Sequence, residues 1–112
     1  MKIEKPGLKL AGKTYKMPDH ISMKVWRTVE KWAEDYAKLA KEKDADYSAL
    51  DEVDACLDNL ALIYGIDRDT IEEGITPEEI FPAHAKAIDY VRTRIYKALE
   101  DIPAAKNDAK NG

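Results

Sequence analysis

The sequence is poor in the residues that carry most covalent and metal chemistry. It has one cysteine, Cys56, and two histidines, His20 and His84, in 112 residues. A single cysteine cannot form a disulfide within the chain, which fits a reducing compartment. No apolar stretch approaches the length that spans a bilayer, and the charged start, residues 1–6, is unlike a signal peptide. We therefore expect a soluble, cytoplasmic protein that does not enter a membrane.

Positive charge is also in short supply. Asp and Glu number 22 against 18 Lys and Arg, which gives a formal net charge of −4. Nucleic acids and anionic lipids are normally bound by clustered positive charge, so we expect neither as a partner. Hydrophobic residues make up 45% of the chain, enough for one modest core. We expect one domain over residues 1–102 and a flexible polar tail over residues 103–112.

The residues that are present predict a short β-hairpin over residues 8–18. Leu8 and Leu10 share one face of a first strand, and Tyr15 and Met17 share one face of a second. Gly12 supplies the positive φ that a tight turn needs, and a proline follows the second strand. A lone hairpin is marginal in water, so it must lean on helices or pair with another chain.

A first helix is predicted from about residue 22 to residue 43, with a break at 44–46. Its apolar side chains span an arc of about 160°, taking 100° per residue. Trp26 and Trp32 lie at opposite flanks of this arc, about 120° apart, so one layer of partner helix cannot easily cover both. The apolar set is Val25, Trp26, Val29, Trp32, Ala33, Tyr36, Leu39 and Ala40.

A second helix is predicted between Ser48, a capping residue, and Gly65, a typical C-terminal stop. Asp51 stands where a capping box has an acidic or amide residue. Apolar residues recur at alternating spacings of three and four, which predicts one seam that packs against another helix. The seam consists of Leu50, Val53, Leu57, Leu60 and Tyr64.

Two further helices are predicted over residues 67–74 and from residue 76 to about residue 100. Thr76, Pro77 and Glu79 form the strongest helix-start signal in the sequence. One face of the last helix is apolar, and Tyr90 and Tyr96 fall outside it. The predicted fold class is therefore mainly α: a small bundle of three to four helices preceded by a short N-terminal β-hairpin. The apolar face of the last helix comprises Ile80, Phe81, His84, Ala87, Ile88, Val91, Ile95, Ala98 and Leu99.

No pattern in the sequence indicates catalysis or a cofactor. His20, His84 and Cys56 lack partners at zinc-motif spacing, so we expect His84 to hydrogen-bond a neighbouring chain segment. The acidic run that starts at Asp67 lacks the glycine of a calcium loop, and a helix N-terminus explains the same acids. We expect a protein that is not an enzyme and holds no metal.

Aromatic side chains are in surplus on helix surfaces, and aromatic residues are enriched at protein interfaces. We predict a protein-binding or self-association surface. Its candidate residues are Trp26, Trp32, Tyr36, Tyr90 and Tyr96.

The order of these features resembles the tail assembly chaperones of long-tailed bacteriophages and prophages, the lambda G-like family. The resemblance covers residues 8–99. It rests on the Leu8–Tyr15 hairpin with its Ala11-Gly12-Lys13 turn, the helix ending in Ile63-Tyr64-Gly65, and the acidic stretch ending in Gly74-Ile75. It implies binding of the tape measure protein, help with polymerising the tail tube protein, and absence from the finished virion.

The resemblance also implies many copies acting together, and a second, longer form made by ribosomal frameshifting. Ala105-Lys106-Asn107 and Ala109-Lys110-Asn111 are each encodable by a slippery heptamer, which makes the tail a candidate slip site. Two alternatives stay open. One is a small helical DNA-binding regulator or accessory protein of a mobile element, although residues 48–64 carry no basic side chain for a recognition helix. The other is a head–tail connector.

Overall fold

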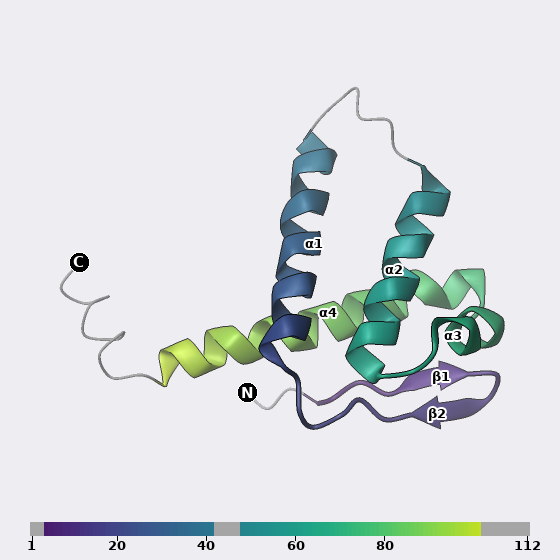
Figure 1. Cartoon of the computed structure of the whole chain (residues 1–112), viewed down its shortest axis with the longest axis horizontal. Helices are drawn as coiled ribbons and strands as arrows, with labels where there is room; N and C mark the ends of the chain where they lie inside the picture. The colour runs from purple at the N-terminus through teal and green to yellow at the C-terminus, as the bar shows by residue number, and fades with distance from the viewer. Residues whose placement is uncertain (1–3, 42–47, 102–112) are drawn as a thin grey trace.

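The computed structural model describes residues 4–41 and 48–101 and confirms a mainly helical chain with a short N-terminal hairpin. The predicted helix end at residue 43, the break at 44–46 and the tail at 103–112 lie outside the described residues. α1 and α2 lie side by side across α4, and the hairpin and α3 lie near the N-terminal end of α4 (Figure 1). The elements are β1 (Leu8–Leu10), β2 (Lys13–Tyr15), α1 (Met23–Lys41), α2 (Ala49–Tyr64), α3 (Arg68–Gly74) and α4 (Pro77–Glu100).

The hairpin is antiparallel, with Leu8 opposite Tyr15 and Leu10 opposite Lys13. Its turn uses two residues at positive φ, Ala11 at 50° and Gly12 at 82°. Positive φ at both central residues is typical of the two-residue turns that join hairpin strands. Alanine is disfavoured at positive φ, because its Cβ approaches the backbone closely there. Both leucines and Met17 are buried in the core. The hairpin therefore leans on the helices of its own chain, one of the two supports expected from the sequence.

Gly74, the last residue of α3, lets the hairpin approach this helix closely. Its carbonyl accepts a hydrogen bond from the Ala11 N–H at 2.8 Å. A Cβ at Gly74 would lie 2.7 Å from the Leu10 Cβ and 3.3 Å from the Leu10 Cα. The Leu10 Cα is a backbone atom and its Cβ is bonded directly to the backbone, so neither can move without moving the buried strand β1. A side chain at position 74 would therefore push β1 away from α3.

Replacing Gly74 with Ala is expected to lower the free energy of unfolding by about 1–2 kcal/mol. Overpacking lowers the free energy of unfolding by about 1–3 kcal/mol. The higher helix propensity of alanine offsets less than about 1 kcal/mol of this at a helix end. Urea denaturation measures the difference. Glu73→Ala, at the exposed neighbouring position, is the control and should change stability by less than about 0.5 kcal/mol. Equal stability of Gly74→Ala and the wild type would contradict the close approach.

The helix ends follow the local signals in the sequence. The Ser48 hydroxyl accepts hydrogen bonds from the N–H groups of Leu50 and Asp51 at the start of α2. Gly65 adopts a left-handed conformation with φ of 67° at its end. At the start of α4, the Glu79 carboxylate accepts hydrogen bonds from the N–H and the hydroxyl of Thr76. These caps satisfy backbone donors and acceptors that a helix leaves unpaired.

The core lies where the C-terminal half of α2 and the N-terminal half of α1 pack on α4. α1 contributes Val25 and Val29, and the last turns of α2 contribute Leu60, Ile63 and Tyr64. The Tyr64 hydroxyl donates to the carbonyl of Pro6 at 2.8 Å, which ties the N-terminal segment to α2. From α4 the buried apolar residues are Ile80, Ala87, Ile88 and Val91.

The opposite halves of α1 and α2 point away from α4 (Figure 1). The predicted seam of α2 is therefore wrong at its first position: Leu50 is 69% exposed, whereas Leu57 and Leu60 are buried. On α1, Tyr36 and Leu39 are exposed although they share the apolar arc with the buried Val29. The apolar stripes of the two helices are longer than the surface that α4 covers.

Candidate functional site

An open groove lies between α1, α2 and α4, with a volume of about 640 Å³, within the range of cavities that hold ligands. We call it the central groove. Small side chains, Ala33, Ala49 and Ala85, line it on each of the three helices and leave room between them. The remaining lining residues are Trp32, Tyr36, Glu52, Phe81, His84, Ile88, Asp89 and Arg92.

The aromatic floor of the central groove is built around Trp32. Its indole stacks on the Tyr36 ring, with centroids 5.2 Å apart and planes 21° from parallel. The same indole meets the His84 ring edge-to-face at 4.4 Å. Such geometries are the favoured ones for aromatic pairs. Trp32 is therefore held by both α1 and α4, while Tyr36 remains 42% exposed at the outer end of the stack.

His84 is buried, 3% exposed, and serves as a structural hydrogen-bond partner. Its Nε2 lies 3.0 Å from the Asn59 amide nitrogen, which donates to it when the ring is neutral. Burial lowers the pKa of His84 to about 4, so the ring is neutral near pH 7. The expectation that His84 hydrogen-bonds a neighbouring segment is confirmed, and the partner comes from α2.

A smaller side pocket of about 170 Å³ continues the central groove between the outer halves of α1 and α2. It shares Trp32, Tyr36 and Glu52 with the groove. Leu39, 40% exposed, adds apolar surface. Its other lining residues are Asp35, Ser48, Asp51 and Ala55. Groove and side pocket together form one concave surface.

Arg92, which lines the central groove, forms an ion pair that joins α4 to α1. The Arg92 Nε lies 3.2 and 3.1 Å from the two carboxylate oxygens of Glu30. The Tyr96 hydroxyl donates to the same carboxylate at 3.0 Å. The Glu30 carboxylate and the Tyr96 hydroxyl raise the pKa of Arg92. This contact joins α1 to α4.

The five residues predicted to bind partners do not form one surface. Trp32 and Tyr36 meet in the central groove, whereas Trp26 and Tyr90 are half-buried against the core. The buried indole Nε1 of Trp26 has no hydrogen-bond acceptor among the residues that the structure describes. Tyr96 is half-exposed and holds Glu30.

Sequence reasoning missed Phe81 as a surface residue, since it falls on the apolar face of α4. It is 46% exposed and lines the central groove. It also borders a second cavity of about 250 Å³ between α2, α3 and α4, whose lining includes Val53, Leu57, Ile75 and Ile80. A detectable signal was the small side chain of Ala85, one turn after Phe81 on α4, which leaves space beside the exposed ring.

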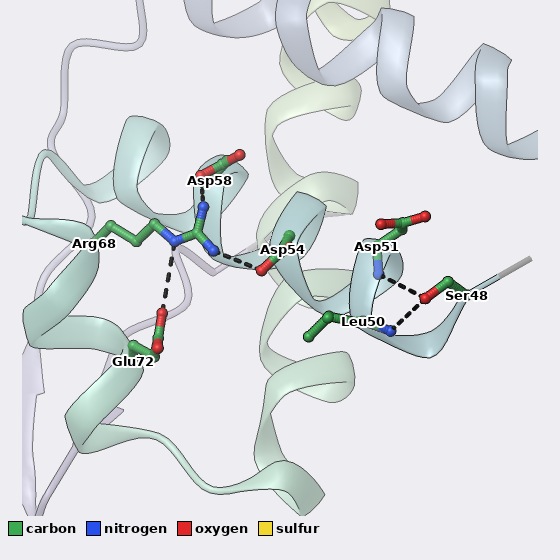
Figure 2. Close-up of polar contacts among 7 residues, drawn as sticks. All are labelled: Ser48, Leu50, Asp51, Asp54, Asp58, Arg68 and Glu72. Carbon is green, nitrogen blue, oxygen red and sulfur yellow. Dashed lines mark hydrogen bonds and ion pairs between the residues drawn. The ribbon is translucent and has the colours of Figure 1, made fainter.

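The acidic face of α2 is partly neutralised by one arginine (Figure 2). Arg68, at the start of α3, lies 2.6 Å from a carboxylate oxygen of Asp54 and 2.6 Å from one of Asp58. Its Nε is 3.7 Å from Glu72 on its own helix. Partial desolvation lowers the pKa of Arg68, but hydrogen bonds to Asp58 and Asp54 outweigh it and raise the pKa overall. The contact joins α3 to α2.

Cys56 is fully buried, and burial together with the Glu52 charge raises the pKa of its thiol to about 12. The thiol is therefore protonated near pH 7, and the reactive thiolate is scarce. Over residues 4–41 and 48–101, His, Cys, Asp and Glu side chains form no group of three that could hold a metal ion.

None of the helices within the described ranges is both long enough and apolar enough to cross a membrane. Comparison of the chain with protein-family models, with curated proteins and with solved structures finds no match.

Proposed function

We propose that this protein is a chaperone that binds a helical segment of another protein in the central groove. Its partner is the tape measure protein of a long-tailed phage, as the resemblance of residues 8–99 implies. Binding would cover apolar surface of that long helical protein until the tail tube protein polymerises around it. The protein would act in the host cytoplasm, in many copies, and be absent from the virion.

The observation that supports this proposal most is the exposed aromatic and aliphatic surface of the groove. Tyr36, Phe81 and Leu39 are each at least two-fifths exposed and line one concave surface with its side pocket. An amphipathic helix laid into an apolar groove is a common mode of peptide recognition. Covering each of these side chains would contribute about 1–2 kcal/mol to binding, since none is fully exposed at the start.

Ala85→Glu tests the proposal without disturbing the core. Ala85 is exposed on α4 and lines the central groove, so a glutamate there adds bulk and an unpaired carboxylate where the apolar stripe of the partner helix would lie. We expect binding of tape measure fragments from the encoding phage, measured by calorimetry, to weaken at least about tenfold, or about 1.4 kcal/mol. Trp32→Ala is a poorer test, because Trp32 also packs on His84.

Ala98→Glu is the matched control for this experiment. Ala98 is an exposed alanine on the same helix, beyond Arg92 and outside the groove lining, and the change in net charge is the same. We expect it to bind like the wild type. If the wild-type protein does not bind the tape measure fragments, the proposed partner is wrong. If both variants bind them as tightly as the wild type does, the central groove is not the binding site.

A further inference from the structure

The side chains around the central groove and its side pocket carry an excess of negative charge. Four carboxylates line the two cavities, against one basic group, Arg92. The carboxylates come from all three helices: Asp35 from α1, Asp51 and Glu52 from α2, and Asp89 from α4. In the whole chain acidic residues outnumber basic ones only 22 to 18. The lining of the two cavities, called the acidic rim below, is therefore more acidic than the chain as a whole.

The single basic group on the rim does little to offset this charge. The Arg92 guanidinium lies 3.1 Å from the Glu30 carboxylate, so its own charge is compensated within the chain. An acidic partner helix would meet like charge on each wall of the groove. A basic partner helix would meet opposite charge on each wall and an aromatic floor beneath. Opposite charges at the rim of an interface mainly set partner choice and the rate of association.

We infer that the central groove selects an amphipathic helix whose apolar stripe is flanked by lysine or arginine residues. This inference rests on the proposed function, in which the groove binds a helix. The apolar stripe would lie on Trp32 and Phe81, while the flanking basic side chains reach Asp35 on α1 and Asp89 on α4. The exposed Tyr36 ring of the Trp32–Tyr36 stack offers a basic side chain a cation–π contact as well.

Three synthetic helical peptides of about 20 residues test this selection, since shorter helices are marginal in water. They share one leucine stripe and differ only in the flanking residues, which are lysine, glutamine or glutamate. We expect the lysine peptide to bind the full-length protein about tenfold more tightly than the glutamine peptide, and the glutamate peptide to bind most weakly. The advantage of the lysine peptide should shrink in high salt, which screens exposed charges.

Variants of the rim show whether the charges named above cause the preference. Asp35→Asn with Asp89→Asn keeps the shape of both side chains and should remove most of the lysine advantage. Glu34→Gln with Glu73→Gln changes the net charge equally at exposed positions outside both cavities, and should preserve it.

The outcomes separate this inference from the proposed function. If the three peptides bind equally well, and Ala85→Glu blocks all of them, the groove binds helices but does not select them by charge. Tighter binding of the glutamate peptide, or no binding of any peptide, would overturn the selection as well. The proposed function is then decided by the tape measure fragments alone.

Discussion

Replacing Leu60 with Ala is expected to lower the free energy of unfolding by about 3 kcal/mol, whereas Leu50→Ala should lower it by less than about 0.5 kcal/mol. The two leucines stand in the same helix and in the same stripe of the sequence. Leu60 is 0% exposed in the core between α2 and α4, and its truncation leaves a cavity. Leu50 lies in the first turn of α2, which points away from α4.

Chemical denaturation of the two variants side by side measures this contrast. The slope of the unfolding free energy against urea concentration should stay unchanged, since both variants expose similar surface on unfolding. A cost of 2 kcal/mol or more for Leu50→Ala in the isolated protein would contradict the open arrangement of α1 and α2.

Lowering the pH from 6.5 to 4 is expected to remove about 3 kcal/mol of stability through His84 alone. The pKa of the buried ring is lowered to about 4 from an ordinary value of 6.5, so the unfolded chain takes up the proton first. Stability from the neutral ring is therefore fully present above pH 6.5, falls by about 2 kcal/mol at pH 5, and is lost below pH 4. Protonation places a donor where Asn59 also donates, and it charges a ring packed on Trp32.

The His84 contribution can be isolated by comparing pH profiles of unfolding. His84→Gln cannot take up a proton in this range, so its stability should fall less between pH 6.5 and 4 than that of the wild type. His20→Gln, at an exposed position before α1, is the control and should keep the wild-type profile. Parallel profiles for the wild type and His84→Gln would contradict the burial of a neutral ring.

Much of the fold could be predicted from residues close together in the sequence. The hairpin, the four helix starts and the glycine stop at Gly65 depend on interactions over a few residues. The candidate site was predicted only in part. Trp32 and Tyr36 lie one turn apart on α1 and meet as their spacing suggests, whereas Trp26, Tyr90 and Tyr96 contribute to packing or to the Glu30 contact.

The remaining site residues could not be found from periodicity. Phe81 and His84 share one apolar face of α4, yet Phe81 is half-exposed and His84 is buried against Asn59. Phe81 and His84 differ in exposure because of where α1 and α2 cross α4. That position depends on packing between residues far apart in the chain, such as the core side chains Val29 of α1, Leu60 of α2 and Val91 of α4.

The sequence by itself determined the kind of chain this is: one cysteine, two histidines, a modest acidic excess, and helices with clear starts and stops. These features act within single residues or single turns, so they need no knowledge of the fold. Only the tertiary structure decided which half of each apolar stripe is covered. Leu50 and Leu60 carry the same side chain and the same periodicity, and burial separates them because α4 reaches one half of α2 and not the other.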